Sequence, residues 1–176
     1  MAAVTTLKAV EANLPVVSQI LINPVCDNTA TAESETWMER PNAPLLTKDR
    51  MLLFRELYLG SRNSPAGEHW TASPIRAPLD LLRKCPKTFI MVAGQDLLRG
   101  ENIQYAQKLQ GANVSVVVRE YEGAPHPFMC MDGILESGKR GMDDLCKDMK
   151  KILAEHLEHS IINRATSTTS LTAKIL

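Results

Sequence analysis

The sequence predicts an α/β protein with an incomplete parallel sheet of about three strands and flanking helices. Three apolar runs rich in β-branched residues, at 16–22, 88–93 and 114–121, are typical of buried strands. Residues 102–110 lie between the second and third runs and carry apolar side chains at helical spacing. A strand, a helix and a further strand in this order form the unit from which parallel sheets are built.

Composition excludes several classes of protein. The 176 residues include 20 basic and 20 acidic side chains, so no basic surplus is available to bind nucleic acid. No uncharged apolar stretch reaches the roughly 20 residues of a membrane span. The four cysteines are widely spaced without a C-x-x-C pair, and no signal peptide opens the chain. We therefore expect a soluble, cytoplasmic protein without a metal site.

The first half of the chain combines helical patterns with irregular segments. Apolar residues at helical spacing over 1–14 begin at the first residue without a capping side chain, which is typical of the continuation of a longer helix. Residues 26–44 are polar and predict a loop. Thr47 is placed to cap a helix over 48–59 that ends at Gly60. Four prolines then predict irregular structure as far as Pro86.

The C-terminal part ends in an amphipathic helix. Its apolar residues recur at helical spacing from Met142 to Leu157. Residues 160–176 are rich in Ser and Thr and predict a flexible tail. The expected organisation is one partial domain over 1–159 followed by this tail.

Two titratable side chains follow the last two predicted strands. Asp96 comes just after 88–93, and His126 comes just after 114–121. Functional groups gather at the carboxyl ends of parallel strands, so both are expected at one edge of the sheet. A carboxylate beside an imidazole makes two thirds of a hydrolytic triad. Taken singly, Asp96 also fits a helix cap, and His126 also fits an ordinary loop position.

The segments around these residues resemble a known family. VAGQDLLRGE and IQYAQKLQGANVSVVVREYEGAPHPF are similar to the C-terminal part of the hormone-sensitive-lipase branch of α/β hydrolases, and GAPHPFMCMDG resembles fungal esterases of the versiconal hemiacetal acetate esterase type. The resemblance implies a carboxylic-ester hydrolase with Asp96 as triad acid and His126 as base. It implies a small-molecule ester substrate, a role in secondary metabolism, and neither metal nor organic cofactor.

The resemblance also assigns a substrate-binding role. Phe54, Tyr58 and Trp70 fall in the segment that contributes to the lid and acyl pocket of the family. Packing in the core is the alternative interpretation of these aromatic side chains. Both interpretations stay open at the level of sequence.

The nucleophile of the family has no counterpart in the sequence. Its serine lies in a G-x-S-x-G turn, and its oxyanion hole uses a His-Gly-Gly-Gly stretch; neither occurs in the 176 residues. The opening residues resemble the helix that follows the serine. Loss of the nucleophile alone costs about 10⁶ in kcat in a serine hydrolase. We therefore expect hydrolysis near background from this truncated chain alone.

A second interpretation is a non-catalytic fragment that binds or assembles with a partner. In the family, a neighbouring strand pairs with the strand expected at 16–22. Without that neighbour, the apolar strand has an open edge, which is prone to pairing with other chains. A protein partner is expected to cover it.

Overall fold

The computed structural model describes residues 1–172. The chain separates into one compact unit, residues 1–141, and a second unit that starts at residue 142. Helix α6 (Glu136–Thr172) extends past residue 160, where the sequence predicts a flexible tail. Residues 173–176 of that predicted tail lie outside the described residues. The domain boundary at residue 159 stays a prediction.

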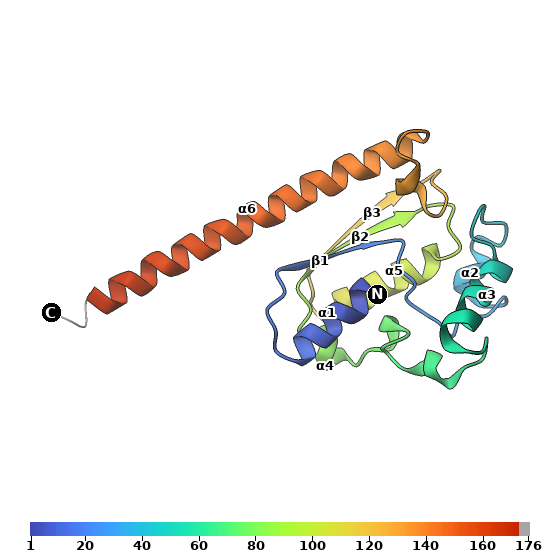
Figure 1. Cartoon of the computed structure of the whole chain (residues 1–176), viewed down its shortest axis with the longest axis horizontal. Helices are drawn as coiled ribbons and strands as arrows, with labels where there is room; N and C mark the ends of the chain where they lie inside the picture. Colours follow the sequence, from blue (N-terminus) through green and yellow to red (C-terminus); the bar gives the residue numbers. More distant parts are fainter. Residues whose placement is uncertain (173–176) are drawn as a thin grey trace. The chain divides into compact units, whose positions relative to one another are not determined.

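The first unit contains a three-stranded parallel sheet (Figure 1). Its strands are β1 (Ser18–Ile22), β2 (Lys87–Ala93) and β3 (Val116–Tyr121), in the order β1-β2-β3. The predicted α/β fold with a short parallel sheet is confirmed. Strands β1 and β3 each begin two residues later than predicted, because pairing starts at Ser18↔Lys87 and Thr88↔Val116.

Five helices accompany the sheet within residues 1–135. They are α1 (Ala2–Glu11), α2 (Glu35–Met38), α3 (Lys48–Leu59), α4 (Leu79–Leu82) and α5 (Arg99–Gly111). Short 3-10 turns occur at Pro65–Glu68, Pro74–Arg76 and Phe128–Met131. The predicted loop over 26–44 therefore contains a helix, and the irregular segment up to Pro86 contains a helix and two turns. These elements are too short to show a period in the sequence.

Helix α3 has the boundaries that the sequence predicts. The Thr47 hydroxyl accepts a hydrogen bond from the Arg50 amide, which satisfies one of the unpaired N–H groups of the first turn. Gly60 ends the helix with a φ of 77°, in the left-handed region that suits a residue without Cβ. Local capping therefore fixes where this helix begins and ends.

Helices α1, α4 and α5 cover one face of the sheet (Figure 1). Leu7 of α1, Leu82 of α4 and Leu109 of α5 are completely buried. They pack in one cluster with Leu21 of β1 and Ile90 of β2. Strand β2, between the other two, is buried at every position after Lys87. The core of this unit therefore lies between the sheet and these three helices.

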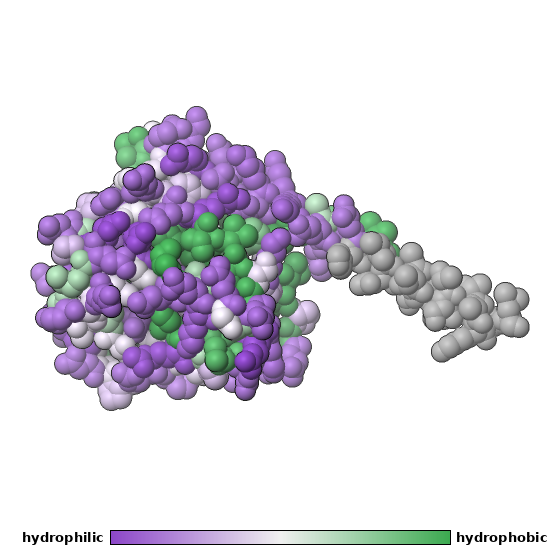
Figure 2. Space-filling view, turned by 180° about the vertical axis from the view of Figure 1, so that it is seen from behind, coloured by the Kyte–Doolittle hydropathy of each residue, from purple (hydrophilic) through white to green (hydrophobic). Residues whose placement is uncertain are grey.

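Strand β1 pairs with β2 on one side, and its other side forms an edge of the sheet. Val17, Ile22 and Val25, in or next to this strand, expose apolar side chains. Figure 2 shows apolar surface gathered near the middle of the face that it presents. Among the described residues, no helix is both long and apolar enough to cross a membrane.

Shortening Leu109 tests where the core lies. Leu109→Ala should lower the free energy of unfolding by about 2–5 kcal/mol, because it opens a cavity at a site without solvent access. Leu57→Ala is the matched control, since Leu57 is 74% exposed, and should stay within about 0.5 kcal/mol of wild type. Urea denaturation measures both. Equal effects of the two variants would contradict the core described above.

Candidate functional site

Asp96 and His126 meet beyond the carboxyl ends of β2 and β3. The Nδ1 atom of His126 lies 2.8 Å from Oδ2 of Asp96. The Asp96 side chain is 1% exposed, whereas that of His126 is 26% exposed. A carboxylate only accepts hydrogen bonds, so the contact assigns the proton to Nδ1 and leaves Nε2 to take up another. The arrangement is that of the acid and base of a hydrolytic triad.

Backbone hydrogen bonds hold the two loops together. The Gly94 amide donates to the Tyr121 carbonyl and the Gln95 amide to the Ala124 carbonyl, each at 2.9 Å. A Cβ atom at Gly94 would collide with the backbone of Glu122, so this close approach requires glycine. The loop bearing Asp96 is thus fixed against the loop that leads to His126.

Asp96 does not cap α5, which was the alternative interpretation of its position, because Leu98 is the N-cap residue of that helix. Asp96 makes a local turn contact instead. Its Oδ1 accepts from the Leu98 amide at 3.1 Å, while Oδ2 contacts His126. One carboxylate therefore serves both the turn and the imidazole. Two bonds on two oxygens leave the side chain little rotational freedom.

A cavity of about 350 Å³ lies beside the carboxyl end of β1. Its walls come from the start of α1, the end of β1 with the loop after it, α3, and residues 71–74 before α4. Phe54 and Tyr58 of α3 line the cavity, and both side chains are more than half exposed. Asp96 and His126 are not among its lining residues.

Trp70 lies apart from both groups. Its ring packs against the core cluster and stacks on His69, with the ring centroids 5.7 Å apart. The Lys8 ammonium lies 6.0 Å from the Trp70 ring centroid. Core packing accounts for this tryptophan. The structure thus brings Phe54 and Tyr58 to the cavity, Asp96 to His126, and Trp70 to neither.

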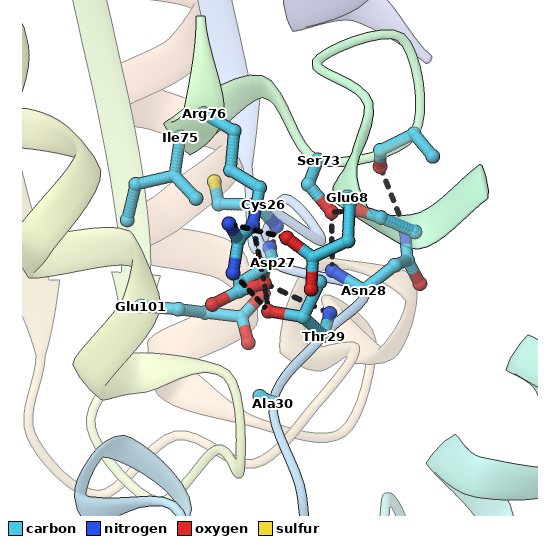
Figure 3. A network of polar contacts seen from close by, with 12 residues as sticks. Cys26, Asp27, Asn28, Thr29, Ala30, Glu68, Ser73, Ile75, Arg76 and Glu101 are labelled. Atoms are coloured by element: carbon cyan, nitrogen blue, oxygen red, sulfur yellow. Dashed lines mark hydrogen bonds and ion pairs between the residues drawn. The ribbon is translucent and has the colours of Figure 1, made fainter. Parts of the chain in front are cut away.

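Glu101, on α5, is hydrogen-bonded to the loop after β1 (Figure 3). Its Oε1 accepts from the backbone amides of Cys26 at 2.7 Å and Asp27 at 3.2 Å. Its Oε2 accepts from the indole nitrogen of Trp37, on α2, at 3.2 Å. Glu101 is completely enclosed, and this burial raises its pKa to about 8, although the three N–H donors oppose the rise.

The same loop is tied to the segment that precedes α4 (Figure 3). Asp27 accepts from the backbone and hydroxyl of Thr29, which in turn accepts from Arg76. The Asn28 amide donates to the Ser73 hydroxyl at 2.7 Å. One wall of the cavity is therefore part of a continuous polar network.

Sequence reasoning did not identify Glu101, Trp37 or Arg55 as site residues. All three are almost completely buried. A signal for Glu101 exists, because it lies one helical turn before Tyr105 and two before Leu109 on a buried face. The side chains that the structure describes include no group of three or more His, Cys, Asp or Glu placed to hold a metal ion.

Comparison with known proteins gives consistent matches. Residues 1–130 match the profile of the α/β hydrolase fold. An AB hydrolase superfamily protein of Schizosaccharomyces pombe is 39% identical over 129 residues, which are 71% of this chain and 36% of that protein. The protein of Arabidopsis thaliana named probable carboxylesterase 11 is 30% identical over 125 residues, which are 69% of this chain and 26% of that protein.

Solved esterase structures agree in fold. Carboxyl esterase 2 of Tuber melanosporum superposes with a TM-score of 0.78 at 28% identity, covering 86% of this chain and 50% of the esterase. A thermostable esterase of Pseudomonas putida gives 0.65 at 35% identity, covering 72% of this chain and 39% of the esterase. The chain thus spans half or less of the length of these relatives.

The buried carboxyl of Glu101 should make stability depend on pH. The pKa rises from an ordinary 4.5 to about 8 on folding, so the folded protein holds a proton that the unfolded chain releases. Stability from this group is complete below pH 4.5 and is lost as the pH rises through 8. Glu101→Gln, which does not titrate, should flatten the fall in free energy of unfolding between pH 5.5 and 8.5.

Urea denaturation across that range measures the slope. Glu33→Gln, at an exposed carboxylate, is the control and should keep the wild-type slope. An unchanged slope in Glu101→Gln would contradict the raised pKa.

Proposed function

Because the chain belongs to the α/β-hydrolase family, we propose that it carries the acid and base of a carboxylic-ester hydrolase. Asp96 orients the imidazole, and His126 acts as general base and then as general acid. The observation that carries this proposal is the 2.8 Å contact between His126 Nδ1 and the buried Asp96 carboxylate. That contact sets the tautomer that catalysis needs.

The proposed reaction requires a serine that these 176 residues do not place in a G-x-S-x-G turn. His126 Nε2 removes the serine proton as the oxygen attacks the ester carbonyl, and then donates that proton to the departing alcohol. Water, deprotonated by the same nitrogen, attacks the acyl-enzyme. The acid is released, the serine regains its proton, and His126 is neutral again. Chemistry therefore depends on pairing this chain's acid and base with a serine from elsewhere.

The cavity beside β1 is the proposed place for the ester. Its apolar lining and the exposed rings of Phe54 and Tyr58 suit an uncharged acyl or aryl group. The finer proposal is an ester of secondary metabolism, handled in the cytoplasm. It rests on the likeness of residues 123–133 to fungal esterases of the versiconal hemiacetal acetate type.

A second candidate function is assembly with a protein partner. The free edge of β1 favours it, since no strand within residues 1–172 pairs with its backbone groups on that side. Ile22, at the end of this edge strand, also exposes an apolar side chain. A strand added to β1 would bury both.

Hydrolysis of 4-nitrophenyl butyrate tests the first proposal. The chain alone should stay near background. Adding the portion of a family esterase that bears a G-x-S-x-G serine should produce turnover, because the proposed reaction requires that serine. His126→Ala should then lower the rate by about 10²–10⁴-fold, and Asp96→Asn should lower it as well.

Two results would contradict the proposed hydrolase function. Turnover by the chain alone that vanishes in His126→Ala would contradict the expected inactivity. Turnover of the mixture that His126→Ala leaves unchanged would contradict the catalytic role of His126.

Light scattering tests the second candidate. The free edge should cause association that grows with protein concentration. Val17→Lys places a charge beside the start of β1 and should reduce this association, because charged side chains discourage edge pairing. Leu57→Lys, at an exposed site on α3, is the control and should not reduce it. A monodisperse wild-type monomer at all concentrations would count against an assembly role.

A further inference from the structure

We propose that Glu101 is a positioning residue that joins two walls of the cavity beside β1, the loop after β1 and helix α3, and thereby sets the affinity of the cavity for an ester. This inference rests on the proposed function, in which that cavity receives the ester. Glu101 itself does not line the cavity. It acts through the loop after β1 on one side and through α2 and α3 on the other.

The first wall is held by α5. Oε1 of Glu101 accepts from the amides of Cys26 and Asp27, and the next residue, Asn102, donates from Nδ2 to the Pro24 carbonyl at 2.6 Å. Pro24 lines the cavity directly. Two consecutive side chains of α5 thus hold the backbone that forms this wall.

The second wall is held through Trp37. Its indole nitrogen donates to Oε2 of Glu101, and the guanidinium of Arg55 lies 5.4 Å from the Trp37 ring centroid. Arg55 is 3% exposed and lines the cavity beside Phe54. Its Nη1 donates to the Ala30 carbonyl, while Nε and Nη2 have no hydrogen-bond partner. The indole face is therefore a principal contact for this buried cation.

One carboxyl group consequently serves both walls, with one oxygen for each. This geometry distinguishes Glu101 from an ordinary core residue. Both oxygens of a carboxyl group keep a lone pair that can accept, even when one of them carries the proton, whereas the amide nitrogen of glutamine only donates. Glutamine at this position therefore has one accepting oxygen, which can satisfy either the loop or the indole. Glu101→Gln should therefore break the link between the two walls while preserving the volume of the side chain.

Calorimetric titration with 1-phenylbutan-1-one, the uncharged ketone counterpart of an ester, tests the inference at pH 7. Glu101→Gln and Trp37→Phe should each weaken binding about three- to tenfold, as expected for the loss of one hydrogen bond. The double variant should bind no more weakly than either single variant, because all three interrupt the same link. Trp37→Phe retains the aromatic packing and leaves Glu101 in place.

Leu109→Ala is the control for a loss of stability alone. It should lower the stability yet keep the dissociation constant within about twofold of wild type. The proposal is overturned if both single variants bind like wild type, if their effects multiply in the double variant, or if Leu109→Ala weakens binding equally. Absence of binding by the wild-type chain would overturn both this inference and the cavity's proposed role. Binding by the chain, with no His126-dependent hydrolysis by the mixture that supplies the serine, would overturn the hydrolase proposal alone.

Discussion

The register between β2 and β3 is the constraint on which the acid–base pair depends. Ala93 and Tyr121 are partners at the ends of these strands, and the hydrogen bonds continue into the loops through the amides of Gly94 and Gln95. The hydrogen bonding of the sheet therefore extends to Gln95, the residue before Asp96. An imidazole at the end of a freely moving loop would lose entropy each time it met its carboxylate. Here the hydrogen bonds between the two loops already restrict that motion.

The first strand is joined to the same edge by one asparagine. The Asn23 amide donates to the Met91 carbonyl, and its side-chain oxygen accepts from the Ala93 amide at 2.9 Å. Asn23 adopts a φ of 42°, a left-handed conformation that asparagine tolerates better than most residues. The chain thus leaves β1 at Asn23 and turns toward the cavity wall. Through the Asn23 side chain, the hydrogen bonding of β2 continues to Ala93, beyond the last residue of β1.

Local signals explain what could be predicted from the sequence. Helix α3 has a capping threonine and a terminal glycine, and both act within one turn of the chain. The proximity of Asp96 to His126 followed from strand order, a rule of parallel sheets that needs no side-chain detail. Trp37 and Glu101 were not predicted because their contacts are not local in the sequence. Helix α2 is too short to show a period, and the donors to Glu101 lie more than 60 residues away in sequence.

The acid–base pair and the cavity are held by separate sets of contacts. Asp96 is fixed by its turn and by His126, whereas the cavity walls depend on Glu101. Both sets meet at the start of α5, where Arg99 bonds to Glu120 of β3 and to Glu39 beside α2. Such part-exposed ion pairs contribute little to stability. They therefore couple the contacts that hold Asp96 only weakly to the contacts that hold the cavity walls. Under the proposed function, ester binding depends on Glu101 and proton transfer on Asp96, and helix α5 begins between these two residues in the sequence.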